Sequence, residues 1–258
     1  MKGDRWSWIG ASSTGTSHLA SGLGCDDAGA CVETFSENGS TLICVVSDGA
    51  GSAALSRIGS HIVVRGFCRS ALKFARSGGR PKDLDREVAF NWLDDIRDRI
   101  ERAASQEGTP SRRPFAATLL GCIVQTDGIA VLHVGDGACA LRLRSEQEWH
   151  VPSWPAQGEF ASTTNFVTDD PKPSANIVYV GGDVAEVALF TDGLERLALK
   201  FAEKKAFTPF FTSMFHAIST QAPGRHKQLS RELRSFLHSN VVTKRTDDDK
   251  TLIMARQY

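Results

Sequence analysis

The pattern of apolar and polar positions groups strands with strands and helices with helices along the chain. Three segments rich in β-branched and aromatic side chains come first and predict strands: residues 6–11, 28–35 and 41–47. Two segments with apolar residues at helical spacing follow and predict helices: residues 52–75 and 84–104. In the second of these, Val88, Trp92, Ile96 and Ile100 stand four residues apart with charged residues between them, which is typical of a helix with one buried face.

The second half repeats this order. Five further strands and three helices are predicted, and then a last strand: strands 118–125, 129–134, 139–144, 176–180 and 184–191, helices 194–200, 209–218 and 227–238, and strand 250–255. Residues 149–173 are rich in Pro, Ser and Thr and lack a clear period, which indicates a long surface excursion of the kind that is often functional. Grouped rather than alternating elements favour an α+β fold with antiparallel sheets, and we expect a single domain over residues 1–258.

Composition and charge narrow the class of protein. The chain has 258 residues, of which 41% are hydrophobic and 23% charged, as in ordinary globular proteins. Its 30 basic residues balance its 30 acidic residues, so no basic face for nucleic acid is expected. We expect neither a signal peptide nor a membrane span, because the chain lacks apolar runs of suitable length. The six cysteines lack the spacing of zinc ligands, and we interpret them as reduced residues of a cytoplasmic protein.

Asp-Gly pairs occur four times, and they differ in context. The pair at Asp127 lies between two apolar strands and is typical of a hairpin turn. The pairs at Asp48 and Asp192 instead end an apolar strand and precede a helix. Capping of the following helix is the simple alternative explanation for each of these two.

A third acidic position makes capping alone less satisfactory. Asp247, Asp248 and Asp249 come just before the last strand, and if that strand is antiparallel to those ending at Asp48 and Asp192, the carboxylates converge at one edge of a sheet. Converging carboxylates require a counter-charge, and Mg²⁺ or Mn²⁺ ions with oxygen ligands provide one. A glycine at position 49 allows its carbonyl oxygen to approach such an ion closely.

Five short motifs resemble, in order, those of the protein phosphatase 2C family, the metal-dependent PPM-type serine/threonine phosphatases: VVSDGAGS, FAATLLG, HVGDGA, ALFTDGLERL and RTDDDKTLIMAR. The opening segment GTSHLASGLGCDDA is similar to a bacterial, PphC-like branch of that family. The resemblance extends over nearly the whole chain. It implies an αββα sandwich, in which two antiparallel sheets stack face to face between layers of helices. It also implies two Mn²⁺ or Mg²⁺ ions at one end, between the sheets.

The resemblance also implies roles for individual residues. Asp48 would bridge both ions and the Gly49 carbonyl would bind one of them, while Asp192 and Asp248 would bind the other. Asp248 is preferred over Asp249 because DDKT matches the family's Asp-Asn-x-Thr pattern at its first residue, so that Asp249 stands where the family has asparagine. Asp27 matches the acid that holds a metal-bound water, with Asp26 beside it a weaker candidate. Asp136 matches an acid that some bacterial members use for a third ion. Two ions that share a water and neutralise phosphate oxygens would hydrolyse phosphoserine or phosphothreonine without a phosphoenzyme.

The chain departs from the family pattern at two positions. Ala50 stands where many members carry a histidine proposed as general acid, and Gly22 stands where many carry a phosphate-binding arginine. His18 is the best nearby substitute for either role, and a purely structural histidine is the alternative. A catalytically weak member that binds phosphoproteins as a regulatory module therefore remains the second hypothesis, and a phosphatase for small metabolites the third. The resemblance further suggests a phosphorylated protein substrate and a cognate serine/threonine kinase as partners, and a flap containing Gly158–Phe160 beside the active site.

Overall fold

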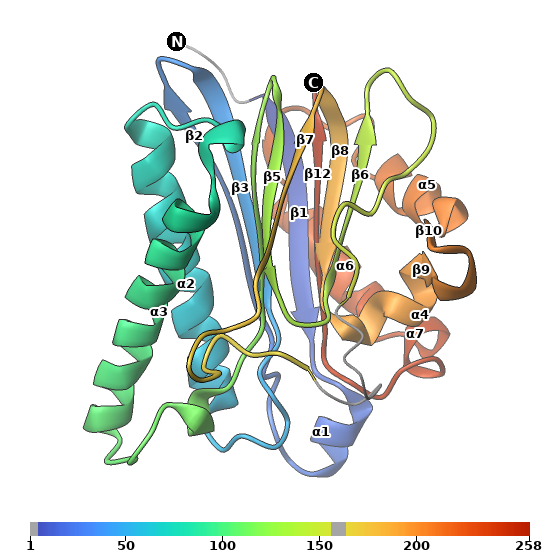
Figure 1. Ribbon diagram of the computed structural model, residues 1–258. Helices are drawn as coiled ribbons and strands as arrows, with labels where there is room; N and C mark the ends of the chain where they lie inside the picture. Colours follow the sequence, from blue (N-terminus) through green and yellow to red (C-terminus); the bar gives the residue numbers. More distant parts are fainter. Residues whose placement is uncertain (1–4, 156–163) are drawn as a thin grey trace.

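The computed structural model describes residues 5–155 and 164–258 and has the expected αββα architecture. Two five-stranded sheets face each other in the middle of the molecule (Figure 1). The first sheet has the order β11 (Gly224–Arg225), β1 (Trp6–Ser13), β12 (Lys250–Gln257), β8 (Val184–Phe190) and β6 (Ala138–Leu143). The second sheet has the order β2 (Ala28–Ser36), β3 (Gly39–Ser47), β4 (Leu119–Gln125), β5 (Gly128–Val134) and β7 (Asn176–Gly181). All pairings are antiparallel except that of β11 with β1.

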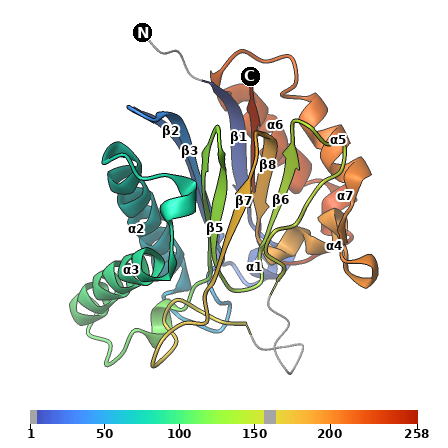
Figure 2. The ribbon, with the colours of Figure 1, turned by 45° about the horizontal axis from the view of Figure 1, so that its top comes forward.

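Helices cover the outer face of each sheet (Figures 1 and 2). The second sheet is covered by α2 (Ser56–Arg76) and α3 (Arg86–Gln106). The first is covered by α4 (Glu195–Ala198), α5 (Thr208–His216), α6 (Lys227–Leu237) and α7 (Asn240–Thr243). The remaining short elements are α1 (Thr16–Ala20), the 3₁₀ turns Pro81–Asp83, Arg113–Phe115, Asp192–Leu194 and Phe201–Glu203, and the two-residue strands β9 (Leu199–Lys200) and β10 (Lys205–Ala206). Within the described ranges, no helix has the length and apolar character needed to cross a membrane.

The apolar residues form three layers that explain the sequence pattern. One layer lies between α2, α3 and the second sheet, one lies between the first sheet and its helices, and the third fills the space between the sheets. Strand β3 is buried on both faces, which is why residues 41–47 form a continuous apolar run rather than an alternating one. All six cysteines are free, as expected.

The long strands and helices lie within a few residues of the predicted bounds, but two predicted helices are shorter than expected. Residues 52–55 form a turn in which the Leu55 amide donates to the Pro114 carbonyl, and α2 begins only at Ser56. The helix expected over residues 194–200 is only one turn of α4, which follows the 3₁₀ turn Asp192–Leu194 and ends where β9 begins at Leu199. In both places the chain must turn beside the acidic residues that end β3 and β8.

Candidate metal centre and active site

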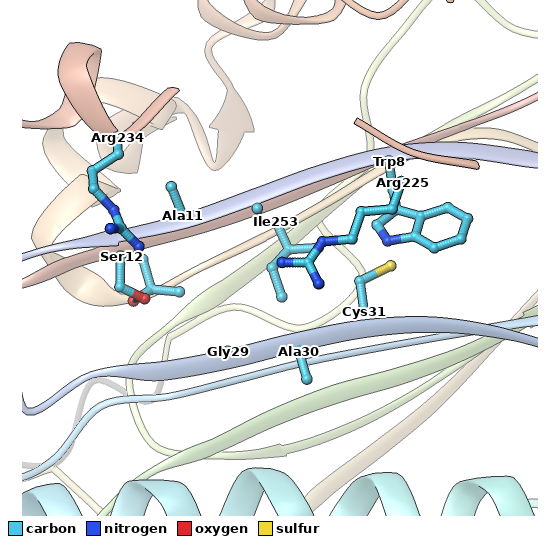
Figure 3. Close-up of a pocket in the computed structure, with 11 residues that line it drawn as sticks. Trp8, Ala11, Ser12, Gly29, Ala30, Cys31, Arg225, Arg234 and Ile253 are labelled. Carbon is cyan, nitrogen blue, oxygen red and sulfur yellow. Dashed lines mark hydrogen bonds between the residues drawn. The ribbon is translucent and has the colours of Figure 1, made fainter. Parts of the chain in front are cut away.

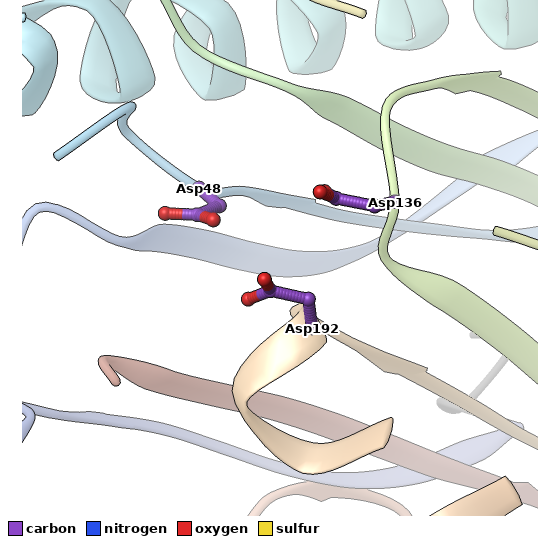
Figure 4. Close-up of side chains that lie close together, drawn as sticks. All are labelled: Asp48, Asp136 and Asp192. Atoms are coloured by element: carbon purple, nitrogen blue, oxygen red, sulfur yellow. The ribbon is translucent and has the colours of Figure 1, made fainter. Parts of the chain in front are cut away.

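Three carboxylates from distant parts of the chain meet between the two sheets. Asp48, Asp136 and Asp192 each offer an oxygen that lies within 4.8 Å of the others (Figure 4). The expectation that Asp48, Asp192 and the acids of residues 247–249 would converge at one edge of a single sheet is wrong in one respect. Strand β12 does pair antiparallel with β8, but β3, which delivers Asp48, belongs to the facing sheet. The acids therefore approach one another across the sandwich, from both sheets.

Hydrogen bonds to Thr118 fix Asp48 at the end of β3. The Asp48 amide donates to Thr118 Oγ1 over 2.9 Å, and the Thr118 amide donates to the Asp48 carbonyl over 2.8 Å. The chain then passes close to the Asp26 carbonyl, which a Cβ at position 49 would approach to 2.8 Å. Glycine is therefore required at position 49 by the packing of the loop, whether or not its carbonyl binds an ion.

Asp136 and Asp192 owe their positions to tight connections. Asp136 lies in the three-residue link between β5 and β6, where the chain crosses from the second sheet to the first. Its side chain accepts a hydrogen bond from Thr164 Oγ1. Asp192 opens the 3₁₀ turn that follows β8, so its carboxylate points back between the sheets (Figure 4).

Among the described residues, no lysine, arginine or histidine forms an ion pair with Asp48, Asp136 or Asp192. Burial and then the charge of Asp136 raise the pKa of Asp192 to about 8. Burial, reinforced by the charges of Asp27 and Asp192, raises the pKa of Asp48 well above its usual range. Oδ1 of Asp136 and Oδ1 of Asp192 are buried without a hydrogen-bond partner in the described structure. Buried, mutually repelling oxygens of this kind fit hard divalent cations, which prefer carboxylate ligands.

Asp248 lies beside this group rather than within it. Its charge contributes to the raised pKa of both Asp48 and Asp192, although its oxygens are not among those within 4.8 Å of one another. Burial also raises the pKa of Asp248 itself. The nearby Lys250 donates from its Nζ to the Asp248 carbonyl over 2.8 Å, and it forms no ion pair with Asp48 or Asp192 in the described structure.

Asp27 is buried next to the cluster and linked to β8 and β12. Thr191 Oγ1 donates to Asp27 Oδ2 over 2.8 Å, and Asp27 Oδ1 is buried without a partner among the described residues. Burial raises the pKa of Asp27 to about 7, and hydrogen bonds from Thr251 and Thr191 oppose this rise. Its neighbour Asp26 points elsewhere and accepts a hydrogen bond from Ser56 Oγ over 3.0 Å.

His18 pairs with Asp249, the acid that follows Asp248. The two lie 3.1 Å apart at His18 Nδ1 and Asp249 Oδ2, and Asp249 also accepts hydrogen bonds from the amides of Gly15 (2.6 Å) and Asp26 (2.5 Å). The Asp249 side chain is 1% exposed and that of His18 15%, so the ring reaches solvent while its anchor does not. A Cβ at Gly51 would lie 3.9 Å from His18 Nε2, which places this nitrogen beside the loop that follows Asp48.

Gly22, which replaces the expected arginine, is exposed in the turn after α1 and has open space around its Cα. Ala50 is buried, and its amide donates to the Ala116 carbonyl. Neither position supplies a charged group. Of the residues proposed for the missing roles, His18 is therefore the one that the fold brings to the loop after Asp48.

Sequence reasoning missed one acid of the site, Glu195, and it placed Asp249 in the acidic run without assigning it a role. Glu195 begins α4, its Oε1 is buried and unpaired among the described residues, and burial together with the charge of Asp192 raises its pKa to about 8. The spacing of Asp192 and Glu195, three residues apart at the start of a helical turn, was the available signal. For Asp249 there was no local signal, because its partner lies 231 residues away.

A groove of about 980 Å³ begins next to the metal centre. Its walls come from the loop after Asp48, from the 3₁₀ turn at Arg113 and from the segment 164–170. Trp154, at the start of the long excursion, packs edge-on against Phe201 with ring centroids 6.1 Å apart. Gly158–Phe160, expected to form part of a flap, lies outside the described residues.

A family model described as Protein phosphatase 2C matches residues 14–238 of the chain. The chain belongs to this family. It is 33% identical over 252 residues to serine/threonine-protein phosphatase 3 of Escherichia coli (strain K12), an alignment that covers 97% of the chain and 98% of the relative.

Solved phosphatase structures share the fold of this family member. Stp1 of Staphylococcus aureus superposes with a TM-score of 0.60 at 16% identity, covering 97% of the chain and 94% of Stp1. The catalytic domain of PstP, solved with 2 manganese ions, superposes with a TM-score of 0.58 at 15% identity, covering 98% of each chain. Family membership and the acidic cluster together identify a metal-dependent serine/threonine phosphatase that uses a divalent ion.

Proposed function

We propose that this chain hydrolyses phosphoserine and phosphothreonine at the centre built by Asp48, Asp136 and Asp192. The observation that carries the proposal is the convergence of these three carboxylates within 4.8 Å between the sheets. Asp48, the Gly49 carbonyl, Asp192 and Asp248 would hold two Mn²⁺ or Mg²⁺ ions, and Asp136 with Asp192 a third. When bound, such ions lower the pKa of a water and neutralise the oxygens of the phosphoryl group.

The residues around the ions would orient the water and exclude the bulk solvent. Asp27 is fixed by Thr191 and has a free oxygen, so it can accept a hydrogen bond from the attacking water and hold its proton at Oδ1. The nucleophile is then water rather than a side chain. Glu195 faces the same cluster and would add negative charge on the side of Asp192 and Asp136.

His18 would give the leaving oxygen its proton from Nε2. Asp249 accepts at Nδ1 and fixes the ring, as a carboxylate orients a catalytic imidazole in other enzymes. The family pattern has asparagine where this chain has Asp249, and histidine where it has Ala50. One explanation fits both departures: His18 serves as the proton donor in place of the histidine that Ala50 replaces, and Asp249 holds its ring with a charged carboxylate instead of a neutral amide.

The substrate we propose is a phosphorylated protein. The groove beside the centre is several times larger than a phosphate group requires, which favours an extended peptide over a small metabolite. A cognate serine/threonine kinase would supply this substrate. The free cysteines favour a cytoplasmic location.

Hydrolysis of a phosphothreonine peptide and of a phosphorylated sugar, each with Mn²⁺, Mg²⁺ or EDTA, tests this proposal. We expect metal-dependent turnover with a kcat/KM at least about tenfold higher for the peptide. Preference for the sugar phosphate would overturn the substrate class. Folded protein that binds the ions and the peptide without turnover would instead support a regulatory binding module.

A further inference from the structure

A second polar cleft lies on the side of the sandwich, between the first sheet and β2, an edge strand of the second sheet. It has a volume of about 270 Å³, and its walls are β1 with β12 on one side and β2 on the other. Figure 3 shows Arg225 and Arg234 reaching into it from one side, with Ile253 and Cys31 between them and β2. None of its lining residues belongs to the acidic cluster, so the cleft is separate from the metal centre.

Strand β11 delivers Arg225. It pairs parallel with β1 so that Arg225 lies opposite Trp8, and the next amide, that of His226, donates to the Trp8 carbonyl over 3.0 Å. The Arg225 side chain starts beside the indole and extends along the gap between the sheets, so its guanidinium lies near Ile253 and Cys31 (Figure 3).

Helix α6 delivers Arg234. The helix is tied to β1 where the Gly10 amide donates to Ser230 Oγ over 3.3 Å. Arg234 lies one helical turn after Ser230, and its guanidinium lies near Ser12 (Figure 3). Ser12 Oγ is hydrogen-bonded with Thr251 Oγ1 over 2.7 Å, and the Ser12 hydroxyl lines the cleft.

The cleft is rich in donors that lack acceptors. Other arginines that meet the sheets, such as Arg142 and Arg144, form ion pairs with Glu186 and Asp183. Arg225 and Arg234 have no ion pair or side-chain hydrogen bond with any residue in ranges 5–155 and 164–258. The indole N–H of Trp8 is buried and likewise has no acceptor in these ranges. Figure 3 shows this nitrogen on the side of the ring that faces the cleft.

We propose that this cleft binds a phosphate group as a second, non-catalytic anion site. Two guanidinium groups and an indole N–H supply donors only, which is the complement of a phosphate's oxygens. The volume is below the roughly 300–1,000 Å³ typical of sites for whole small molecules, which favours a single phosphate rather than a nucleotide. The chain carries no net charge, so attraction of the anion depends on these local groups.

Calorimetric titration of the full chain with inorganic phosphate in EDTA tests the proposal. Without ions, the carboxylates of the metal centre repel phosphate, so binding under these conditions reports on the cleft alone. We expect Arg225→Ala and Arg234→Ala each to weaken phosphate binding at least tenfold, because each removes charge-assisted hydrogen bonds. Arg231→Ala is the matched control, since Arg231 is exposed on the same helix, does not line the cleft, and is expected to leave binding unchanged.

Two further arms identify the source of the phosphate and the position of the site. A phosphothreonine peptide that binds more tightly than inorganic phosphate, while its unphosphorylated form does not bind, would assign the cleft to phosphoproteins. Tighter binding of free phosphate would assign it to the free anion. The change in intrinsic fluorescence on binding should disappear in Trp8→Phe. Phosphate binding that both arginine variants retain in full, or wild-type protein that does not bind phosphate, would overturn the proposal.

Discussion

His18 is held with one ring nitrogen 3.1 Å from the buried carboxylate of Asp249 and the other beside Gly51. A side chain placed in this way is suited to deliver a proton to an oxygen in the space near the Asp48 loop. The role has a consequence that a structural histidine would not have. Protonation matters for a poor leaving group such as an alkoxide and hardly at all for a nitrophenolate.

We therefore predict that His18→Asn lowers kcat about 100-fold for a phosphothreonine peptide but only slightly for p-nitrophenyl phosphate. Asp249→Asn should show the same selectivity with a smaller loss, because the ring remains but is less well oriented. Steady-state kinetics on both substrates measure the difference. Equal losses on the two substrates would mean that His18 does not donate a proton.

The raised pKa values of the acids at the metal centre predict how the stability of the fold depends on pH. The pKa values of Asp27, Asp192 and Glu195 are raised to about 7, 8 and 8, whereas in the unfolded chain they return to their ordinary acidic values. Between about pH 4 and pH 8 the folded chain therefore binds more protons than the unfolded chain, and its stability falls as the pH rises.

Denaturant unfolding in EDTA should show this loss between pH 5 and pH 8. We expect Asp192→Asn to reduce this loss of unfolding free energy by on the order of 2 kcal/mol, because the amide side chain does not titrate. Addition of Mn²⁺ to the wild-type protein at pH 8 should restore the stability. The same pH dependence in wild type and Asp192→Asn would contradict this account of the cluster.

At the scale of elements, helix α3 supports the groove beside the active site. Arg97, 6% exposed, donates to the carbonyls of Val167, Asp169 and Pro171 and pairs with Asp170. One helical side chain thus holds a whole segment of the groove wall. The segment has little regular structure of its own, so these hydrogen bonds define its path.

Arg97→Met should destabilise the protein by about 2–4 kcal/mol, because it leaves the buried Val167 carbonyl and two partly buried carbonyls without this donor. At a temperature where the variant is folded, KM for a phosphopeptide should rise several-fold while turnover of p-nitrophenyl phosphate is little changed. Arg99→Met, on the same helix, is the control. Unchanged KM for the peptide would show that segment 164–170 does not contact the substrate.

Helices and strands with a long hydrophobic pattern could be predicted from the sequence alone. The four-residue spacing from Val88 to Ile100 and the apolar run of β3 each reflect burial against a sheet, and both elements form where predicted. Helix α1 has no buried residue, and it is fixed by the Ser17 amide donating to the Asp247 carbonyl, a contact that local patterning does not encode. The same limit hid the pairing of Asp249 with His18. Its role depends on a loop more than two hundred residues away, and it stands where the family pattern has a neutral asparagine.

At the scale of the whole molecule, the metal centre depends on both sheets. Asp48 comes from the second sheet and Asp192 from the first, and Asp136 lies on the link between them. A centre of this kind forms only when the two sheets pack face to face. Its geometry is therefore a property of the complete sandwich and of the apolar layer between the sheets.

We predict that the chain unfolds as one domain, in a single cooperative transition. Ile96→Ala, on the buried face of α3, and Phe211→Ala, on the buried face of α5, should each lower the midpoint of that same transition. Truncating a buried side chain of this kind costs about 2–5 kcal/mol. Circular dichroism and tryptophan fluorescence should give coincident curves. Two separate transitions, each sensitive to only one substitution, would show that the two halves fold independently.

The most direct test of the central claim is phosphothreonine-peptide hydrolysis with Mn²⁺ by wild type, Asp48→Asn and Asp192→Asn. Asp94→Asn, an exposed acid on α3, is the matched control. We predict Mn²⁺-dependent turnover that both site variants lose by at least about 1,000-fold while remaining folded, and that the control retains. Turnover by either site variant close to that of wild type would contradict the assignment of the catalytic ions to this acidic cluster.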